Sequence, residues 1–137
     1  MKSTAYFKED EFKCKCCGQL PKLCPPDGLV DILIEIREHF DKPVRINSGY
    51  RCPKHNKAVG GAPKSRHVVG DAVDISVQDV PTADVYNWVL ETYGSRPLGI
   101  AKKLNKDPYK GFVHIDTRGV KARWAYSGSY EPEVRNA

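Results

Sequence analysis

The chain has 137 residues, 40% of them hydrophobic, and a formal net charge of +5 at pH 7. This length supports one domain with a buried core, and the composition lacks the low hydrophobicity of a disordered chain. Lysine and arginine are interleaved with acidic residues, so the charge suits any polyanionic surface and singles out neither nucleic acid nor a cell wall. We expect one domain over residues 1–137, with an irregular cysteine-rich arm over 1–25, a core over 26–125 and a tail over 126–137.

Residues 1–12 contain no apolar segment of the kind found in secretory signal peptides. No later stretch approaches the roughly 18 uninterrupted apolar residues of a membrane span. We therefore expect a protein that is cytoplasmic as synthesised and does not insert into a membrane. If it works outside the cell membrane, another component must release it.

The first regular element is predicted over residues 26–40, followed by a short strand over 44–47 and a loop over 52–65 that is rich in glycine and proline. A second helix is predicted from Thr82, as its N-cap, to a stop at Gly94. The stripe that predicts the first helix consists of Leu29, Ile32, Leu33, Ile36 and Phe40.

Alternation of apolar and polar residues predicts the remaining strands. One strand over 72–77 places Asp74 on the face opposite its valines and isoleucine. Two more strands, over 98–101 and 112–117, are joined by a polar turn, and the second carries His114 and Asp116 together on one face. The fold class is therefore α+β, with a small antiparallel sheet and helices packed on one face.

Three polar residues from this pattern are candidate metal ligands. His67 precedes the strand that carries Asp74, with Gly70 allowing the chain to turn between them, and His114 lies on the last strand. Two imidazole nitrogens and one carboxylate oxygen form a three-ligand zinc site that leaves a position open, as catalytic zinc sites do. From the residue types alone, ordinary surface or capping roles compete with this interpretation.

The segments that carry these residues form a longer pattern. The motif S-x-H-x-x-G-x-A-x-D begins at Ser65, is preceded by INSGYRCPKHNKAVGGAPKS and is followed downstream by GFVHIDTR. This pattern resembles the zinc D-Ala-D-Ala carboxypeptidase and L-alanyl-D-glutamate endopeptidase family of peptidoglycan peptidases. That family shares its metal-site fold with lysostaphin and the hedgehog signalling domain. The resemblance extends over residues 12–124.

The resemblance implies a role for each matching residue. His67, Asp74 and His114 would bind one catalytic Zn²⁺ ion. Arg51 would bind a substrate carboxylate, which a guanidinium recognises through two parallel hydrogen bonds, and Ser65 would help hold the peptide. The implied reaction is metal-assisted hydrolysis of a peptidoglycan peptide at D-Ala-D-Ala, at L-Ala-D-Glu or at a cross-bridge.

The chain departs from this family at one position. Many members carry an acidic general base three residues before the last zinc histidine, where this chain has Gly111. Asp116 lies on the same strand face as His114, roughly 7 Å away by the strand repeat, and is our candidate for the base. The alternative role is to orient a zinc ligand. If no base reaches the water, the protein would be a non-catalytic zinc-binding module that recognises peptidoglycan or a protein partner.

Cysteines crowd the N-terminal arm. The C-x-C-C-x6-C spacing lacks the paired C-x2-C units of common zinc ribbons, and no export signal favours a disulfide framework. We expect reduced, partly buried thiols, with a second, structural zinc or a disulfide to Cys52 as the alternatives. The arm's cysteines are Cys14, Cys16, Cys17 and Cys24.

The partners follow from the same resemblance. The small size, basic charge and missing signal peptide resemble bacteriophage lysis or tail-associated enzymes, which reach the wall through holin pores or by injection; a prophage or bacterial copy fits equally. No stripe of arginine and aromatic residues predicts nucleic-acid binding. We expect a monomer that acts on peptidoglycan and not on nucleic acid.

Overall fold

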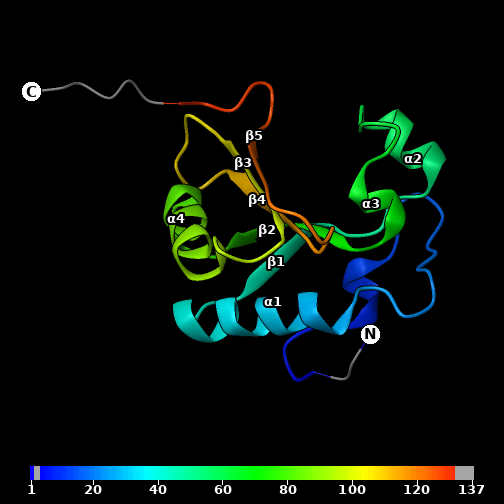
Figure 1. The fold of residues 1–137 in the computed structure, drawn as a ribbon, viewed down its shortest axis with the longest axis horizontal. Helices are drawn as coiled ribbons and strands as arrows, with labels where there is room; N and C mark the ends of the chain where they lie inside the picture. The colour runs from blue at the N-terminus through cyan, green and yellow to red at the C-terminus, as the bar shows by residue number, and fades with distance from the viewer. Residues whose placement is uncertain (2–3, 132–137) are drawn as a thin grey trace, which may run out of the picture.

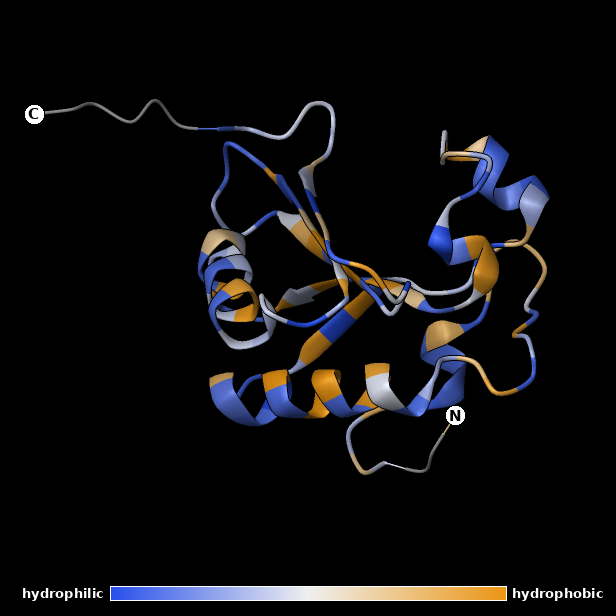
Figure 2. Cartoon of the chain, viewed as in Figure 1, coloured by the Kyte–Doolittle hydropathy of each residue, from blue (hydrophilic) through white to orange (hydrophobic). Residues whose placement is uncertain are grey.

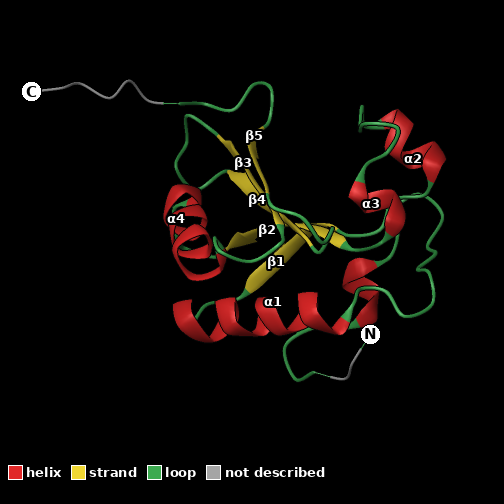
Figure 3. Cartoon of the chain, viewed as in Figure 1, coloured by secondary structure: helices red, strands yellow, loops and turns green. Residues whose placement is uncertain are grey.

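The computed structural model describes residue 1 and residues 4–131, so the last part of the predicted tail, residues 132–137, lies outside the described residues. A central sheet is surrounded by helices (Figures 1 and 3). In chain order the elements are η1 (Glu9–Phe12), α1 (Asp27–Phe40), β1 (Val44–Ser48), α2 (Pro53–Ala58), α3 (Arg66–Val69), β2 (Ala72–Val77), α4 (Thr82–Tyr93), β3 (Gly99–Leu104), β4 (Gly111–Asp116) and β5 (Ala122–Ala125).

The sheet has the strand order β1-β2-β4-β3-β5. All neighbouring pairs are antiparallel except β3 and β5, which are parallel. The predicted α+β class with a small, mostly antiparallel sheet is confirmed. Strand β5 was not predicted, because this four-residue strand at the sheet edge has no clear alternation of apolar and polar residues.

Helices α1 and α4 cover one face of the sheet and form the hydrophobic core with it (Figure 1). Apolar residues concentrate on α1 and on the strands, whereas α2 is mostly hydrophilic (Figure 2). The predicted stripe on α1 is confirmed as a buried surface, with Phe40 at its partly buried end. The core residues of the strands include Val44, Ile46, Val73, Ile75, Val77, Ile100, Val113 and Ile115.

Two local predictions are wrong. The predicted loop over 52–65 contains helix α2, which begins with Pro53 in its first turn and is too short and too polar for a helical stripe to show in the sequence. Thr82 is the first residue of α4 and not its N-cap, which is Pro81. The Thr82 hydroxyl instead donates a hydrogen bond to the Lys110 carbonyl at 2.8 Å, tying the helix to the loop before β4.

The N-terminal arm is part of the packed structure. Phe7 and Phe12 are buried in the core, and Tyr50 N–H donates to the Phe12 carbonyl at 2.9 Å. The arm therefore supports the segment that follows β1, which carries Arg51. None of the helices in the described residues combines the length and apolarity needed to cross a membrane.

Candidate active site

The sheet face opposite the two large helices carries a row of aligned side chains. Asp74 on β2 pairs with His114 on β4, His114 pairs with Ala101 on β3, and Ala101 pairs with Trp124 on β5. Because the small Ala101 separates the two rings, Trp124 approaches His114 to a centroid distance of 5.2 Å. Strand register thus brings the predicted polar face of β2 and β4 together, although Asp74 and His114 are themselves almost fully buried.

His67 reaches this row from the short helix α3. The Ser65 hydroxyl accepts the His67 N–H at 3.2 Å at the start of the helix, and Gly70, with φ +95°, ends it. The chain then turns directly into β2, as predicted. His67 is 1% exposed, and its Nδ1 lies 2.7 Å from the Gly49 carbonyl.

Three atoms converge at the centre of this arrangement. His67 Nε2 and His114 Nδ1 each lie 3.0 Å from Asp74 Oδ1, and one ligand atom from each residue lies within 4.8 Å of the others. The Gly49 carbonyl can only accept, so it fixes the His67 proton on Nδ1 and leaves a lone pair on Nε2. A carboxylate on the far side of His114 likewise fixes its proton on Nε2, at 2.7 Å from Asp116 Oδ2.

Neutral imidazoles in these tautomers direct two nitrogen lone pairs at a carboxylate oxygen. Such a set of acceptors is satisfied by a cation, and two histidines with one carboxylate are a donor set that suits Zn²⁺. The residues present therefore fit a zinc ion at His67, Asp74 and His114.

The electrostatics of the ion-free site agree with this chemistry. Burial by itself raises the pKa of Asp74, but the neighbouring imidazoles of His114 and His67 outweigh it and lower the pKa to about 2. Burial lowers the pKa of His114, whereas the carboxylates of Asp116 and Asp74 raise it, and the net direction is upward. The pocket therefore favours positive charge at the point where the three atoms meet.

Asp116 is 0% exposed and holds His114 from behind. Its Oδ2 lies 2.7 Å from His114 Nε2, and Arg118 donates to both of its oxygens, at 2.8 and 2.7 Å. Gly99 N–H also donates a hydrogen bond to Asp116 Oδ1 at 3.2 Å. Only glycine allows this close approach, because a β-carbon at residue 99 would lie 2.2 Å from Asp116 Oδ2. Burial raises the pKa of Asp116, but Arg118 and His114 outweigh it and hold that pKa well below its usual range.

Gly111, the position of the missing acidic residue, has no room for a side chain. Its φ is +93°, and a β-carbon there would lie 2.1 Å from the Lys103 carbonyl oxygen on β3. An acidic residue could therefore not be accommodated on this backbone. The absence of an acidic residue at position 111 is therefore built into the backbone of the β3–β4 hairpin.

Arg51 lies beside the three converging atoms. Its guanidinium donates to Ser48 Oγ at 3.0 Å, to Asn56 Oδ1 at 3.4 Å and to Asp74 Oδ2 at 3.2 Å. These bonds use the Nε–H and one N–H of each terminal nitrogen, so each terminal nitrogen retains one further N–H. Two N–H donors of the guanidinium therefore remain for a substrate group.

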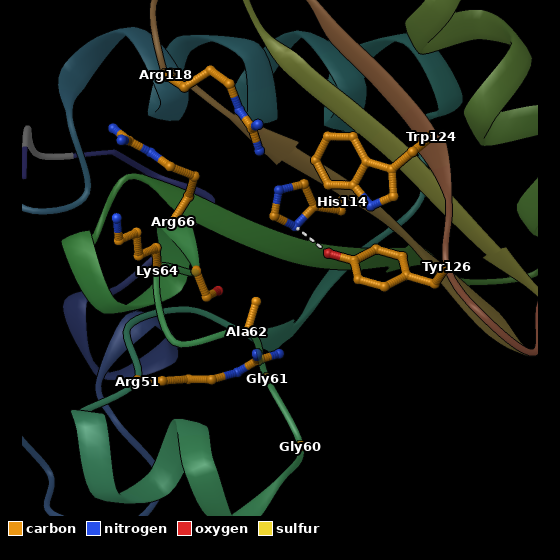
Figure 4. Close-up of a pocket in the computed structure, with 11 residues that line it drawn as sticks. Arg51, Gly60, Gly61, Ala62, Lys64, Arg66, His114, Arg118, Trp124 and Tyr126 are labelled. Carbon is orange, nitrogen blue, oxygen red and sulfur yellow. Dashed lines mark hydrogen bonds between the residues drawn. The ribbon is translucent and has the colours of Figure 1, made fainter.

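A cavity of about 540 Å³ opens above His114, and Arg51 and Ser65 both line it. In Figure 4 the basic side chains lie on one side of the opening, and two aromatic side chains lie on the other. No carboxylate lines the cavity among the residues that the structure describes. The basic and aromatic lining residues are Arg51, Lys64, Arg66, Arg118, Trp124 and Tyr126.

Three residues of this site were not assigned a role from the sequence. The Tyr126 hydroxyl lies 3.1 Å from His114 Nδ1 (Figure 4). Arg118 braces Asp116, and the buried Asn56 side chain connects Arg51 to the Ala62 carbonyl at 2.8 Å. Asn56 and Arg118 lie within the motifs quoted above, but their partners become visible only when the loops are folded.

The structure groups the cysteines differently from the four-cysteine zinc site considered as an alternative. All five are free in the described part of the chain. A convergent group forms from Cys14, Cys17 and Cys52, whereas Cys16 is exposed and Cys24 lies elsewhere, with its Sγ 3.9 Å from the Val69 carbonyl. This group therefore shares Cys14 and Cys17 with the four-cysteine alternative and contains Cys52 in addition.

A family model described as Peptidase M15 matches residues 5–116, which include the converging histidines and aspartate and also Arg51. No curated protein gives a significant match.

Proposed function

The chain belongs to the peptidase M15 family, a family of zinc metallopeptidases, and from this premise we propose that it hydrolyses the short peptides of bacterial peptidoglycan. The observation that carries the proposal is the convergence of His67, Asp74 and His114 on one point, with His114 also lining a basic cavity. The proposed reaction is carboxypeptidase or endopeptidase cleavage.

The three converging residues would hold the zinc ion. When bound, zinc supplies a Lewis acid for the scissile carbonyl and lowers the pKa of a water molecule. His67 and His114 are held in the correct tautomers by the Gly49 carbonyl and by Asp116. Asp74 shares its two oxygens between this point and Arg51.

Arg51 and Ser65 would bind the substrate. The two remaining N–H groups of Arg51 would donate hydrogen bonds to a free peptide carboxylate, which peptidoglycan stems carry at D-Ala and D-Glu. Ser65 uses its oxygen as an acceptor for His67 N–H, so its hydroxyl hydrogen remains to be donated to the peptide. The basic lining of the cavity favours an acidic peptide of this kind.

We assign Asp116 to the positioning of His114. Both of its oxygens accept hydrogen bonds, it is fully buried, and its depressed pKa makes it a poor proton acceptor. Tyr126 faces the cavity with its hydroxyl. Burial, followed by the charge of Asp74, raises the pKa of Tyr126, so the hydroxyl stays protonated and can donate to the carbonyl oxygen of a substrate.

We also propose that the protein reaches the cell wall after release from the cell in which it is made, as bacteriophage lysis enzymes do, and that it acts as a monomer. A non-catalytic module that binds zinc and peptidoglycan is the second candidate. The observation that favours it is the backbone at Gly111, which leaves no space for the usual acidic base.

The experiment that separates the two is digestion of purified muropeptides by the zinc-loaded protein, followed by mass spectrometry. We expect a cleaved stem peptide with the wild type. His114→Ala is expected to lose one equivalent of zinc and at least about 10³-fold in activity, because the metal contributes several kcal/mol to the transition state. Binding of muropeptides by a zinc-loaded wild type that releases no product would establish the second candidate instead.

A further inference from the structure

A second cluster of metal-binding side chains lies outside the active site, where the N-terminal arm meets the loop between β1 and α2. The sulfur atoms of Cys14, Cys17 and Cys52 lie within 4.8 Å of one another. Three sulfurs around a tetrahedral zinc ion at about 2.3 Å are about 3.8 Å apart. The three side chains therefore need to close by no more than about 1 Å to share an ion.

The backbone around Cys14 is arranged to stabilise a thiolate. Cys52 N–H donates to Cys14 Sγ at 3.3 Å, and the N–H groups of Cys16 and Cys17 also point at this sulfur. Cys17 is followed by Gly18, whose φ is +69° and whose N–H closes the turn on the Cys14 carbonyl at 2.8 Å. This C-x-x-C-G turn with N–H groups directed at its first sulfur has the form of one half of a zinc-binding unit.

The pKa values of the Cys14 and Cys17 thiols also favour a cation at this position. Burial raises the pKa of the Cys14 thiol, but the backbone N–H groups, that of Cys52 first, outweigh it and lower the pKa to about 6. The Gln19 N–H lowers the pKa of Cys17, yet burial and the neighbouring Cys14 thiolate outweigh it and raise that pKa. A second thiolate is disfavoured beside the first unless a cation lies between them.

The segment between β1 and α2 supplies the second pair of potential zinc ligands. Cys52 is followed by Pro53, Lys54 and His55, and His55 N–H donates to Cys52 Sγ at 3.4 Å. A C-x-x-H unit thus faces the C-x-x-C unit, with a backbone N–H again directed at the first sulfur. The His55 side chain is half-buried at the start of α2 and joins the three sulfurs only if its side-chain torsions change.

We propose that Cys14, Cys17 and Cys52 bind a second zinc ion, with His55 turned inward as the fourth ligand. Four protein ligands close the coordination sphere, so this site is structural. The proposal is independent of the hydrolytic function, because it rests on residues that do not touch the cavity.

The site would fix the part of the active site that the sheet does not hold. Cys52 is covalently next to Arg51, whose N–H donates to the His67 carbonyl at 3.0 Å. Lys15, between the first two cysteines, donates to the Asn47 carbonyl at 2.6 Å. The second zinc would link the N-terminal arm to the segment that carries Arg51.

The test replaces zinc by cobalt in the full chain under reducing conditions and records the absorption spectrum. Thiolate ligands give an intense sulfur-to-cobalt charge-transfer band, which a histidine and carboxylate site lacks. We expect this band in the wild type and in His114→Ala, and its loss in Cys17→Ser and Cys52→Ser. The wild type should also contain about two equivalents of zinc, and each cysteine variant about one.

Matched controls come from the two cysteines outside the group. Cys16→Ser and Cys24→Ser should keep the band, and His55→Gln should weaken it and alter the ligand-field bands. Alkylation of the wild type gives an answer that needs no variant to fold. Cys16 and Cys17 are both exposed, so exposure alone would give equal labelling. If zinc protects Cys17, Cys16 should be labelled quickly and Cys17 only after a chelator is added.

Several results would overturn the proposal. They are a wild type that shows no charge-transfer band, equal labelling of Cys16 and Cys17 before chelation, or a disulfide within the group under reducing conditions. An unchanged spectrum in His55→Gln would overturn the assignment of the fourth ligand. Since His114→Ala is expected to lose hydrolysis and to keep the band, failure of the proposed function and failure of this site are distinguishable.

Discussion

The two walls of the active site are built on different principles. On the sheet wall, Asp74, His114 and Asp116 lie in neighbouring register positions, and hydrogen bonds between strands fix their separations. On the loop wall, Arg51 and His67 are carried by a segment with only short helices. Their positions depend on contacts distant in sequence, such as Tyr50 N–H to the Phe12 carbonyl.

This difference teaches where each function can be placed. The sheet wall can set ligand geometry to a fraction of an ångström because a register shift would move the whole core. The loop wall can shape a binding surface, but it needs braces such as the Asn56 amide and the backbone of the N-terminal arm. The predictions below act on one wall at a time.

After His114→Ala, the largest expected effect is on the loop wall, in Arg51→Ala. Loss of the carboxylate partner should lower kcat/KM for a substrate with a free terminal carboxylate by about 10²- to 10³-fold. The exposed Arg45 on β1 supplies the control, Arg45→Ala, which should retain activity. The measurement is repeated on an amidated substrate, on which wild type and Arg51→Ala should be nearly equal. An equal loss on both substrates would show that Arg51 acts by holding Asp74 and not by binding carboxylate.

The same division explains what the sequence could predict. Alternation in β2 and β4 revealed that Asp74, His114 and Asp116 share a face, because side-chain direction in a strand is a local property. On the loop wall, His67 was predicted as a candidate ligand from the residues and from the family resemblance, while α2 and the bracing role of Asn56 were missed. Helix α2 is too short and too polar to show a hydrophobic stripe, and the contacts of Asn56 with Arg51 and Ala62 depend on the folded loop, which no hydrophobic pattern encodes.

The next prediction concerns the sheet wall at Gly111→Glu, which would restore an acidic residue at the family position. We expect the fold to lose about 3 kcal/mol and no gain in activity, because the β-carbon would collide with the Lys103 carbonyl at a positive φ. Gly28→Ala, in open space on α1, is the control and should change stability little. Denaturant unfolding measures both. A stable Gly111→Glu variant with higher kcat would show that the hairpin can rearrange and that strand register constrains this position only weakly.

A smaller effect is expected from Asp116→Asn, which keeps the shape of the side chain and removes its charge. Zinc affinity should fall about 10- to 100-fold, because His114 loses the charged acceptor that orients it. Competition with a chromophoric chelator gives the affinity, with the exposed Asp84→Asn as the control. If Asp116 were the general base, Asp116→Asn would bind zinc with wild-type affinity and lose nearly all turnover.

The smallest effect is expected from Tyr126→Phe, where the chain leaves the sheet wall and enters the cavity. Removal of one neutral hydrogen-bond donor should lower kcat by about 10-fold, with KM and zinc content unchanged, if the hydroxyl acts on the transition state alone. Tyr109→Phe, at a tyrosine that is 60% exposed and outside the cavity lining, is the control. A rise in KM with constant kcat would mean that the hydroxyl binds substrate and transition state equally. Because His114 Nδ1 and the Tyr126 hydroxyl are only 3.1 Å apart, a loss of zinc in Tyr126→Phe would instead assign the hydroxyl to the support of the metal ligand.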